Sequence, residues 1–424
     1  MKIMVIGGGG REHAIIKKIR QGKGEHEIYC LPGNAGMAGE ATCIDIKAKE
    51  IDKIVEFARE NGIEYAIVAQ DDPLALGCVD RLNEVGVPCF GPTAKAAEIE
   101  SSKVFAKNLM KKYGIPTSEY EVFDNSKKAL KYVKTAKYPI VIKADGLALG
   151  KGVTIAQNEK EAVDAIVSVM ETKVFGESGN KVVIEEFMEG PEVSVLSFCD
   201  GKTIVPMVSS MDHKRAYDGD NGPNTGGMGT IAPNPFYTPE VQRECEEKII
   251  KPTVEAMRKE GRPFKGCLYF GLMVTKDGPK VVEYNCRFGD PETQVVLPLL
   301  ESDLLEIMLA TTNGTLDKTE VRFSNKSACC VVLASQGYPV KYEKGYSIFV
   351  PDDIKDNVYF AGVASDHGEL VTNGGRVLGV TTVADDLKSA IKKSYKYAKR
   401  ISFRKSFMRT DIGAKALNAL ENNQ

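Results

Sequence analysis

Hydrophobic and polar positions in the first hundred residues alternate between two patterns. Short apolar runs predict three buried strands, at Ile3–Ile6, Glu27–Leu31 and Tyr65–Ala69. Apolar residues at helical spacing predict three helices between and after them, at Glu12–Arg20, Asp52–Asn61 and 74–86. Strands that alternate with helices indicate parallel βαβ units. We therefore expect a doubly wound parallel α/β domain over residues 1–100.

The pattern changes near residue 101. Apolar spacing predicts helices at Ser101–Tyr113, 125–136 and 159–171. Strands are predicted at Tyr120–Phe123, Pro139–Lys143, Val153–Ala156 and Val182–Phe187. Ser101 or Ser102 and Asn158 are suitable N-cap residues for two of these helices. Residues 101–190 are therefore expected to form an α+β unit with a glycine-rich hairpin at its centre.

The remainder of the chain predicts two further parts. Residues 191–324 contain longer strands around a glycine-rich loop and a helix near 300–310. Residues 325–424 predict strands at Ala328–Ala334 and Val377–Val383 and a basic amphipathic helix at 386–400. The whole is a multidomain α/β and α+β protein, with expected divisions near 100, 190 and 324.

Composition narrows the class of protein. The chain has 424 residues, 43% hydrophobic and 27% charged, and a formal net charge of -2. This balance, without a block of Lys and Arg, argues against a nucleic-acid partner. No apolar run approaches the ~18 residues of a membrane span, and the short apolar start does not resemble a signal peptide. The ten cysteines form no CxxC pair and no zinc-spaced cluster, which favours a reducing cytoplasm.

The most informative segment runs from Val281 to Thr293. An apolar strand there places Glu283, Asn285 and Arg287 at alternate positions, so all three are predicted to share one face. A carboxylate, an amide oxygen and a guanidinium suit a Mg²⁺ ion that carries a polyphosphate. A half-exposed edge strand with a polar outer face is the alternative that this segment alone leaves open.

A glycine turn follows the first strand, in the sequence Gly7–His13. The third glycine of a dinucleotide fingerprint is missing, because Glu12 or His13 occupies its position. The turn still places backbone N–H groups and Arg11 at a helix N-terminus, which favours the phosphate monoester of a small substrate. A tight turn without a ligand is the alternative.

Two lysines flank the glycine-rich hairpin at Lys143–Gly152. Such a loop can fold over phosphates while Lys143 supplies a point charge. The strand–GxxxxGK[ST]–helix order of a Walker A loop is absent. An ordinary hairpin tip is the alternative, although the lysines disfavour it.

Two more segments have polar residues in suggestive positions. Val182–Glu192 is an apolar strand that leads into a polar hinge, and its backbone can face a nucleotide base while Glu192 reaches a ribose. A solvated acidic strand end is the alternative. The loop from Asp212 to Gly229 is rich in glycine, which predicts close approach of the backbone to a ligand. His213 in this loop is a candidate base or a structural histidine.

Taken in order, these motifs resemble the glycinamide ribonucleotide synthetase family of the ATP-grasp superfamily. The matching runs are GGGGREHA (7–14), LPGNAG (31–36), FGPTAKAAEIESSK (90–103), IKADGLALGKGV (142–153), VIEEFMEGPEVS (183–194), DHKRAYDGDNGPNTGGMG (212–229) and VEYNCRFGDPETQ (282–294). The resemblance spans the chain. It implies an ATP-grasp fold with an N-terminal α/β domain, a small lid subdomain at about 120–187 and a C-terminal α+β domain.

The resemblance also implies a role for each matching residue. ATP would be bound by Lys103, Lys143, Gly146, Gly150, Lys151, Gly152, Glu185, Phe187, Met188 and Glu192. Mg²⁺ or Mn²⁺ would be held by Glu283 and Asn285, and the catalytic groups would be Lys143, Arg287 and Asp290. The other substrates would contact Gly9, Gly10, Arg11, Asn34, Asp212, Lys214, Asn224, Thr225, Gly226, Gly227, Pro291, Glu292 and Thr293.

The implied reaction joins glycine to 5-phosphoribosylamine through a glycyl phosphate and releases ADP and phosphate. Another ATP-grasp ligase or carboxylase is the first alternative, and a nucleotide-binding protein without turnover is the second. A monomer in the cytoplasm is expected, with a weak dimer as the alternative. One departure concerns the metal. Many ATP-grasp enzymes have a further acidic ligand about a dozen residues before Glu283, where this chain has Tyr269–Leu272.

Overall fold

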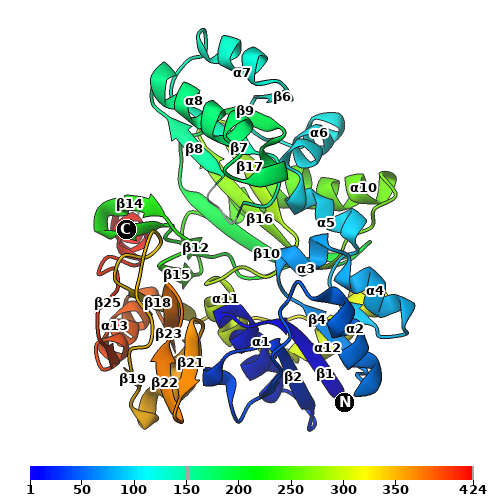
Figure 1. Ribbon diagram of the computed structural model, residues 1–424, viewed down its shortest axis with the longest axis vertical. Helices are drawn as coiled ribbons and strands as arrows, with labels where there is room; N and C mark the ends of the chain where they lie inside the picture. The colour runs from blue at the N-terminus through cyan, green and yellow to red at the C-terminus, as the bar shows by residue number, and fades with distance from the viewer. Residues whose placement is uncertain (149–151, 423–424) are drawn as a thin grey trace.

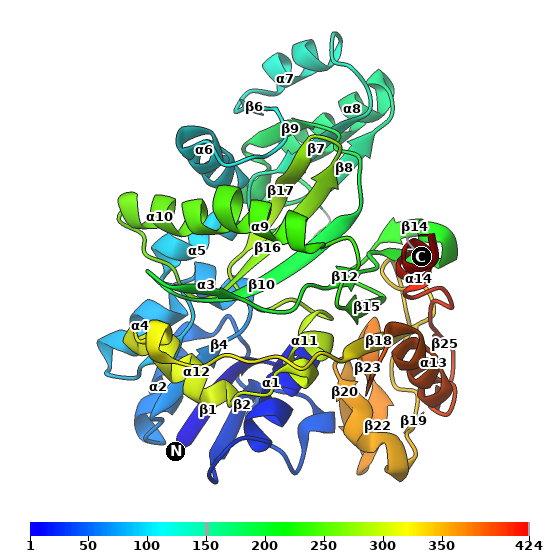
Figure 2. The same cartoon turned by 180° about the vertical axis from the view of Figure 1, so that it is seen from behind.

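The computed structural model describes residues 1–148 and 152–422 (Figure 1). A small sheet module, in cyan and green-cyan, forms one end of the molecule. The N-terminal and C-terminal parts lie side by side at the opposite end, and Figure 2 shows the same arrangement from behind. Gly150 and Lys151, two predicted ATP ligands, fall outside the described residues.

The N-terminal part is a five-stranded parallel sheet in the order β3-β2-β1-β4-β5. Its strands are β1 Lys2–Gly7, β2 Glu27–Pro32, β3 Thr42–Cys43, β4 Tyr65–Val68 and β5 Cys89–Phe90. Its helices are α1 Gly10–Arg20, α2 Ile51–Glu60, α3 Asp71–Ala75 and α4 Cys78–Glu84. The predicted parallel α/β arrangement is confirmed.

Alternating side chains of β1 explain why both faces of this sheet are covered. Ile3 and Val5 pack with the buried face of α1 and with α11 (Thr293–Leu299) and α12 (Leu304–Asn313). Met4 and Ile6 point to the opposite face, where α2, α3 and α4 pack. Because successive side chains of a strand point to opposite faces, β1 contributes to two apolar clusters, one on each side of the sheet.

One of the predicted helices is divided in the structure, and the helix predicted at Ser101–Tyr113 is preceded by one that was not predicted. The helix predicted at 74–86 is two short helices, α3 and α4, because Gly77 between them has a left-handed φ of +80°. The region before Tyr113 also contains two helices, α5 Ala94–Ser101 and α6 Lys103–Tyr113. Ser102 separates them and caps α6, because its hydroxyl accepts a hydrogen bond from the N–H of Phe105.

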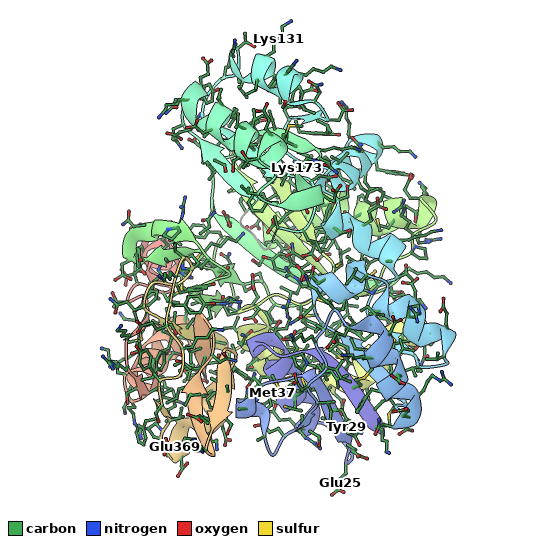
Figure 3. The ribbon with its side chains drawn as sticks, in the orientation of Figure 1. Glu25, Tyr29, Met37, Lys131, Lys173 and Glu369 are labelled. Carbon is green, nitrogen blue, oxygen red and sulfur yellow. The ribbon has the colours of Figure 1, made fainter. Side chains whose placement is uncertain are left out.

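The small module is an antiparallel sheet in the order β6-β9-β7-β8. Its elements are β6 Tyr120–Phe123, α7 Ser126–Val133, β7 Ile140–Ala144, β8 Val153–Ala156, α8 Glu159–Ile166 and β9 Val182–Glu186. Both helices share a separate apolar cluster with the sheet. Figure 3 places Lys131 and Lys173 within this module, far from Glu25 at the other end. The predicted α+β unit is confirmed.

A second antiparallel sheet, in the order β11-β10-β16-β17, forms the middle of the molecule. Its strands are β10 Glu192–Asp200, β11 Ile204–Pro206, β16 Lys265–Thr275 and β17 Gly278–Asn285. Two helices, α9 Pro239–Cys245 and α10 Lys251–Lys259, pack against it. This sheet carries the strand with Glu283 and Asn285.

A third sheet joins the middle of the chain to its C-terminal part. Its order is β12-β15-β18-β23-β20, and β25 also pairs with β18. The strands are β12 Met211–Asp212, β15 Gly229–Ala232, β18 Ser327–Ser335, β20 Val358–Phe360, β23 Arg376–Ala384 and β25 Ser406–Phe407. The expected division near 324 therefore crosses a continuous sheet, because β15 pairs with β18.

The remaining strands form short two-stranded pairs, and two further α-helices lie near the C-terminus. They are β13 Arg215–Tyr217 with β14 Asn221–Asn224, β19 Ile348–Phe349 with β24 Ser402–Phe403, β21 Val363–Asp366 with β22 Glu369–Thr372, α13 Leu387–Ala398 and α14 Ala414–Asn422. All ten cysteines are free. Within residues 1–148 and 152–422, no helix is both long and apolar enough to cross a membrane.

Candidate functional site

The end of β17 places Glu283 and Asn285 close to the small module. Glu283 keeps 37% of its side chain exposed, whereas Asn285 is buried. The strand ends at Asn285, so the prediction that a strand also carries Arg287 is wrong. Arg287 lies in the bend that follows. The strand therefore presents a carboxylate and an amide, and the guanidinium reaches the site from the loop beyond it.

Four cationic side chains surround the Glu283 carboxylate. Partial desolvation raises its pKa, but Lys214, Lys143, Lys103 and Arg287 lower it by more, so the pKa lies below its usual value. These cations come from four different segments of the chain. An excess of positive charge around one carboxylate is a suitable environment for a polyphosphate.

Lys214 stands between two of the predicted ligands. Its Nζ lies 3.3 Å from Glu192 Oε2 and 3.8 Å from Glu283 Oε1. The Glu192 carboxylate, with a further contribution from Glu283, raises the pKa of Lys214 well above its usual value. The structure thus brings the predicted ribose residue, metal residue and substrate lysine into one chain of contacts.

The metal prediction is compatible with the donor atoms present. Glu283 and Asn285 supply one carboxylate and one amide oxygen, which matches Mg²⁺ that completes its shell with phosphates and water. The residue paired with Glu283 on β16 is Gly271, so this position adds no acidic ligand. Within the described ranges, no group of three or more His, Cys, Asp or Glu side chains is arranged to hold a metal ion.

Glu100 holds Arg287 in place. Arg287 Nη2 lies 3.0 Å from Glu100 Oε1, and the other oxygen of Glu100 accepts a 2.7 Å hydrogen bond from the N–H of Cys286. Burial raises the pKa of Glu100 despite the opposing effect of Arg287, while Glu100 raises the pKa of Arg287 against its own burial. Arg287 Nε is buried without a hydrogen-bond partner among the described residues. A fixed guanidinium with an unsatisfied donor suits an anionic ligand.

Lys143 and Glu185 form a buried ion pair inside the small module. Lys143 Nζ lies 3.0 Å from Glu185 Oε1 and also donates to the carbonyl oxygen of Val282, at 3.2 Å. Lys103 Nζ donates to the carbonyl oxygen of Gly146 at 3.0 Å, next to the glycine hairpin. Burial lowers the pKa of Lys103. Of the two lysines predicted to bind phosphates, Lys103 therefore contacts the glycine hairpin and Lys143 contacts β17.

The chain after β9 has unused backbone donors. The N–H groups of Phe187 and Met188 have no hydrogen-bond partner among the described residues. Met188 is buried, and Glu192 follows at the start of β10, with its side chain 52% exposed. An unpaired backbone segment beside an exposed carboxylate is compatible with the predicted base and ribose contacts.

The glycine turn before α1 already carries two carboxylates. Glu12 Oε2 accepts a 2.6 Å hydrogen bond from the N–H of Gly9, and Asp290 Oδ2 accepts one of 3.3 Å from the N–H of Arg11. The Arg11 side chain also binds protein atoms, namely Glu12 Oε1 at 2.9 Å and the carbonyl oxygen of Phe288 at 2.7 Å. The N-terminus of α1 is therefore partly occupied by anionic side chains.

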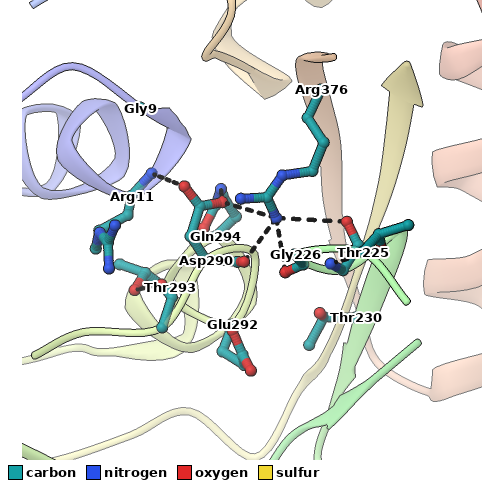
Figure 4. Close-up of polar contacts among 12 residues, drawn as sticks. Gly9, Arg11, Thr225, Gly226, Thr230, Asp290, Glu292, Thr293, Gln294 and Arg376 are labelled. Carbon is teal, nitrogen blue, oxygen red and sulfur yellow. Dashed lines mark hydrogen bonds and ion pairs between the residues drawn. The ribbon is translucent and has the colours of Figure 1, made fainter. Parts of the chain in front are cut away.

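Arg376 joins the C-terminal part to this turn (Figure 4). Its Nη1 donates to the carbonyl oxygens of Asp290, at 2.7 Å, and Gly226, at 2.8 Å. It also lies 3.6 Å from the Asp290 carboxylate, where Gln294 Nε2 donates at 2.8 Å. Burial raises the pKa of Asp290, but Arg376 and Arg11 lower it by more. Asp290 is thus held as an anion between two arginines.

Two glycines in this region leave no space for a side chain. A Cβ on Gly227, whose φ is +118°, would lie 2.5 Å from Asp212 Oδ1 and 2.5 Å from Pro291 Cδ. A Cβ on Gly10 would lie 2.5 Å from Gln294 Nε2. The glycines therefore allow the 226–227 and 290–294 segments to approach, and Thr225 supports this loop through a 2.9 Å hydrogen bond from the N–H of Gly227.

Several carboxyl and hydroxyl groups gather beside this loop. Tyr269 donates to Glu292 Oε1 at 3.1 Å and shares a 2.8 Å hydrogen bond with Ser194. Burial and the nearby Glu292 raise the pKa of Asp212 well above its usual value. Thr293 is buried and donates to the carbonyl oxygen of Gly289. Glu292, the residue predicted to meet glycine, is therefore positioned by Tyr269.

Two predicted substrate residues have local roles in the structure. Asn34 donates to the carbonyl oxygens of Gly8, at 2.9 Å, and Phe360, at 3.0 Å, so it ties the glycine turn to β20. Its side-chain oxygen accepts a hydrogen bond from the N–H of Gly36. Asn224 lies on the exposed β13–β14 hairpin, opposite Arg215. The described contacts do not bring Asn224 to the cluster around Asp290.

His213 is a structural residue. Its Nδ1 lies 3.0 Å from the carbonyl oxygen of Gly229, and its Nε2 accepts a 3.1 Å hydrogen bond from the N–H of Gly413. A carbonyl only accepts and an N–H only donates, so these partners fix the neutral tautomer with the proton on Nδ1. Burial lowers the pKa of His213 to about 4. Both ring nitrogens serve to connect β15 to the C-terminal segment.

Replacing His213 with glutamine is expected to make stability less dependent on pH. The unfolded state takes up a proton near the ordinary histidine pKa of 6.5 and the folded state only near 4, so His213 stabilises the fold above pH 6.5 and loses this effect as pH falls towards 4. The difference amounts to about 3 kcal/mol. Urea unfolding of wild type and variant between pH 7.5 and 4 measures it. His367→Gln, at an exposed position, is the control, and parallel curves for wild type and His213→Gln would contradict the prediction.

The sequence did not identify several residues that complete the site: Glu12, Glu100, Lys107, Tyr269, Gln294 and Arg376. Two of them had a usable signal. Lys107 lies one helical turn after Lys103, and Gln294 directly follows Thr293 in a motif already noted. Arg376 had none, because β23 is remote in sequence and the third sheet brings it to Asp290.

A small antiparallel sheet next to one with longer strands, with lysines and a carboxylate gathered where they meet, is the arrangement of the ATP-grasp class. A model of the phosphoribosylglycinamide synthetase ATP-grasp (A) domain matches residues 101–293. Models of the N and C domains of the same family match residues 1–100 and 328–415. The chain belongs to the phosphoribosylglycinamide synthetase family.

Similar proteins agree with this assignment. The phosphoribosylamine–glycine ligase of Caldanaerobacter subterraneus subsp. tengcongensis is 48% identical over 415 residues, which cover 98% of this chain and 100% of its own. The crystal structure of the phosphoribosylamine–glycine ligase from Thermotoga maritima has a TM-score of 0.87 and 35% identity, and covers 97% of this chain and 100% of its own. The biotin carboxylase domain of Hydrogenobacter thermophilus 2-oxoglutarate carboxylase, with a TM-score of 0.75, 19% identity and coverage of 96% and 91%, shares the fold.

Proposed function

We propose that this site joins glycine to 5-phosphoribosylamine through a glycyl phosphate, with release of glycinamide ribonucleotide, ADP and phosphate. Membership of the family makes the chain an ATP-dependent ligase of the phosphoribosylamine–glycine type. The observation that carries the site assignment is the Glu283 carboxylate among Lys103, Lys143, Lys214 and Arg287. That arrangement is suited to a nucleotide polyphosphate.

Glycine needs activation because a carboxylate is a poor electrophile at neutral pH. One glycine carboxylate oxygen attacks the γ-phosphorus of ATP, and the bond from that phosphorus to the β–γ bridging oxygen breaks to release ADP. The amine of phosphoribosylamine then attacks the carbonyl carbon of glycyl phosphate. Phosphate leaves with its electron pair, and the nitrogen loses a proton as the amide forms. The protein needs no covalent nucleophile for either step, so positioning and charge neutralisation are its main contributions.

The nucleotide is assigned to the junction of the small module and the middle sheet. Lys103 and Lys143 contact phosphates, together with the Gly146–Gly152 hairpin. Glu185 and the backbone of Phe187 and Met188 hold adenine, and Glu192 holds the ribose. The buried Lys143–Glu185 pair and the unused N–H groups after β9 support this placement. We also assign Gly150 and Lys151, which lie outside the described residues, to the ATP site.

Mg²⁺ or Mn²⁺ is assigned to Glu283 and Asn285. When bound, the ion would neutralise charge on the β- and γ-phosphates. The Lys214 ammonium lies 3.8 Å from Glu283 and so shares the carboxylate that the ion requires. Arg287, held by Glu100, stabilises negative charge on the transferring phosphoryl group.

Glycine and phosphoribosylamine are assigned to the region around Asp290. Pro291, which Glu292 and Thr293 follow, lies against Gly227 together with Asp212. The 5-phosphate is assigned to the turn of Gly9, Gly10 and Arg11. Phosphate bound there must take N–H groups that Glu12 and Asp290 now accept, and this exchange is a specific consequence of the proposal. We also propose that the protein works as a cytoplasmic monomer.

An ADP-release assay tests the reaction. With ATP, Mg²⁺, glycine and freshly made phosphoribosylamine, ADP should form in proportion to glycinamide ribonucleotide. Omission of glycine or of the amine should reduce ADP release to background. Release that proceeds equally well with bicarbonate or formate in place of glycine would overturn the assignment in favour of another carboxylate substrate.

A further inference from the structure

A cluster of three buried charges lies where the small module meets α6. Lys107 comes from α6, Lys143 from β7 and Glu185 from β9, and their side chains are 3%, 7% and 2% exposed. Lys107 Nζ lies 3.2 Å from Glu185 Oε2, and Lys143 Nζ lies 3.1 Å from the same oxygen. One carboxylate therefore contacts two ammonium groups.

Lys107 has a full set of partners. Its Nζ donates to Thr117 Oγ1 at 2.7 Å and to Ser118 Oγ at 2.8 Å, and the contact with Glu185 uses its third proton. Ser118 in turn donates to Glu185 Oε2 at 2.9 Å, and Thr117 donates to the carbonyl oxygen of Val281 at 2.7 Å. Lys107 thus connects the small module to β17, the strand that carries Glu283.

The other oxygen of Glu185 is not satisfied in this way. Oε1 faces Lys143 at 3.0 Å but has no hydrogen bond of acceptable geometry among the described residues. All the fixed contacts of Lys107 and Ser118 are made to Oε2. The carboxylate is therefore held by hydrogen bonds to one oxygen, while its second oxygen is buried against Lys143 without a hydrogen bond from the described residues.

The charges around Lys107 also affect its pKa. Two ammonium groups and one carboxylate leave a net positive charge in a buried place, which is costly. Burial lowers the pKa of Lys107 to about 8, and Lys143 contributes in the same direction, while Glu185 and Glu186 oppose it. The ring of Tyr120 on β6 also lies 5.6 Å from Nζ. The Lys107 ammonium therefore titrates close to physiological pH.

We propose that Lys107 is a positioning residue of the nucleotide site: it fixes the Glu185 carboxylate against Lys143, so that both present a defined geometry to ATP. This inference rests on the proposed placement of ATP at Lys143 and Glu185. It assigns no direct contact with the nucleotide to Lys107. A residue that acts in this way should affect ATP more than glycine, and its effect should follow its protonation.

Lys107→Gln is the direct test, because glutamine keeps donors for Thr117 and Ser118 but removes the charge. The KM for ATP is expected to rise about tenfold, the equivalent of one charge-assisted hydrogen bond, with KM for glycine within about twofold. In wild type the KM for ATP should rise above pH 8, and in Lys107→Gln this alkaline rise should be absent. Lys107→Arg, which keeps the charge, should recover part of the affinity and remain flat above pH 8.

Lys111→Met is the matched control. Lys111 lies one turn further along the same helix, its side chain is exposed, and its Nζ lies 5.7 Å from the same Tyr120 ring. Its kinetics should equal those of wild type. Thermal unfolding of each variant separates loss of fold from loss of affinity.

Lys143→Met tests the nucleotide placement separately from the positioning role of Lys107. If Lys143→Met leaves the KM for ATP unchanged, the proposed nucleotide placement itself is wrong. If Lys143→Met raises the KM for ATP and Lys107→Gln does not, the nucleotide placement stands and the positioning role is overturned. Equal rises in the KM for ATP and for glycine in Lys107→Gln would also overturn it, because they would indicate a general structural effect.

Discussion

Replacing Glu283 with alanine is expected to abolish turnover, with a fall in kcat of about a thousandfold or more, while the fold stays intact. Glu283 supplies the carboxylate of the proposed metal pair, and Asn285 alone offers only a neutral oxygen. Removal of the carboxylate also leaves Lys103, Lys143 and Lys214 to repel one another. Its side chain is 37% exposed and has one distant ion pair, so the free energy of unfolding should change by only about 0.5 kcal/mol.

The measurement is ADP release at saturating ATP, glycine and phosphoribosylamine over a series of Mg²⁺ concentrations. Glu283→Gln, which keeps the shape and loses the charge, should be almost as inactive as Glu283→Ala. Glu255→Ala, at an exposed position on α10, provides a control in which one acidic side chain is lost without effect on kcat. Activity near that of wild type in Glu283→Ala, at any Mg²⁺ concentration, would remove this residue from the mechanism.

Much of the fold could be predicted from the periodicity of apolar residues. The buried run Ile3–Ile6 and the helical spacing after it are local signals, and the structure confirms both. The same method predicted one helix at 74–86, because a period of apolar residues continues across Gly77. Gly77 has a left-handed backbone that ends one helix and starts the next. A pattern of side chains does not contain that information.

The third sheet shows a different limit of sequence analysis. β12 and β15 come from the middle of the chain and pair with each other, and β15 also pairs with β18 of the C-terminal part. Strand pairing depends on contacts between segments about a hundred residues apart, and no local pattern specifies which strands become neighbours. The division expected near residue 324 stays a prediction, and the pairing of β15 with β18 runs across it.

The candidate site likewise contains residues that a local sequence pattern identifies and residues that only the folded chain brings together. Glu283, Asn285 and Lys143 could be proposed because each lies in a short run with a recognisable chemical pattern, and Lys103 because its run resembles the family. Glu100 and Arg376 could not, since their function depends on partners far away in the sequence. The role of Glu100 can be recognised only in the folded structure, where its Oε1 lies 3.0 Å from Arg287 Nη2. The role of Arg376 can be recognised only there too, because β23 brings it to Asp290.

Replacing Arg287 with lysine is expected to lower kcat by about a thousandfold, with a change in the KM for ATP of less than about threefold. Lysine keeps a positive charge beside Glu100, so the buried carboxylate does not become unpaired. It cannot reproduce the planar guanidinium, which binds Glu100 through Nη2 and leaves Nε for another partner. The loss should therefore appear in the transfer of the phosphoryl group. Single-turnover formation of ADP measures this step directly.

A double-mutant cycle with Glu100→Gln separates direct action from support. If Arg287 acts on the phosphoryl group and Glu100 only orients it, Glu100→Gln should be slow, and adding it to Arg287→Lys should cause little further loss. Additive losses would mean that Glu100 acts on the reaction without Arg287. Arg262→Lys, at a surface arginine paired with Glu98, is the control for the change of side chain. If Arg287→Lys turns over at the rate of wild type, the guanidinium is needed for the loop after β17 and not for the chemistry.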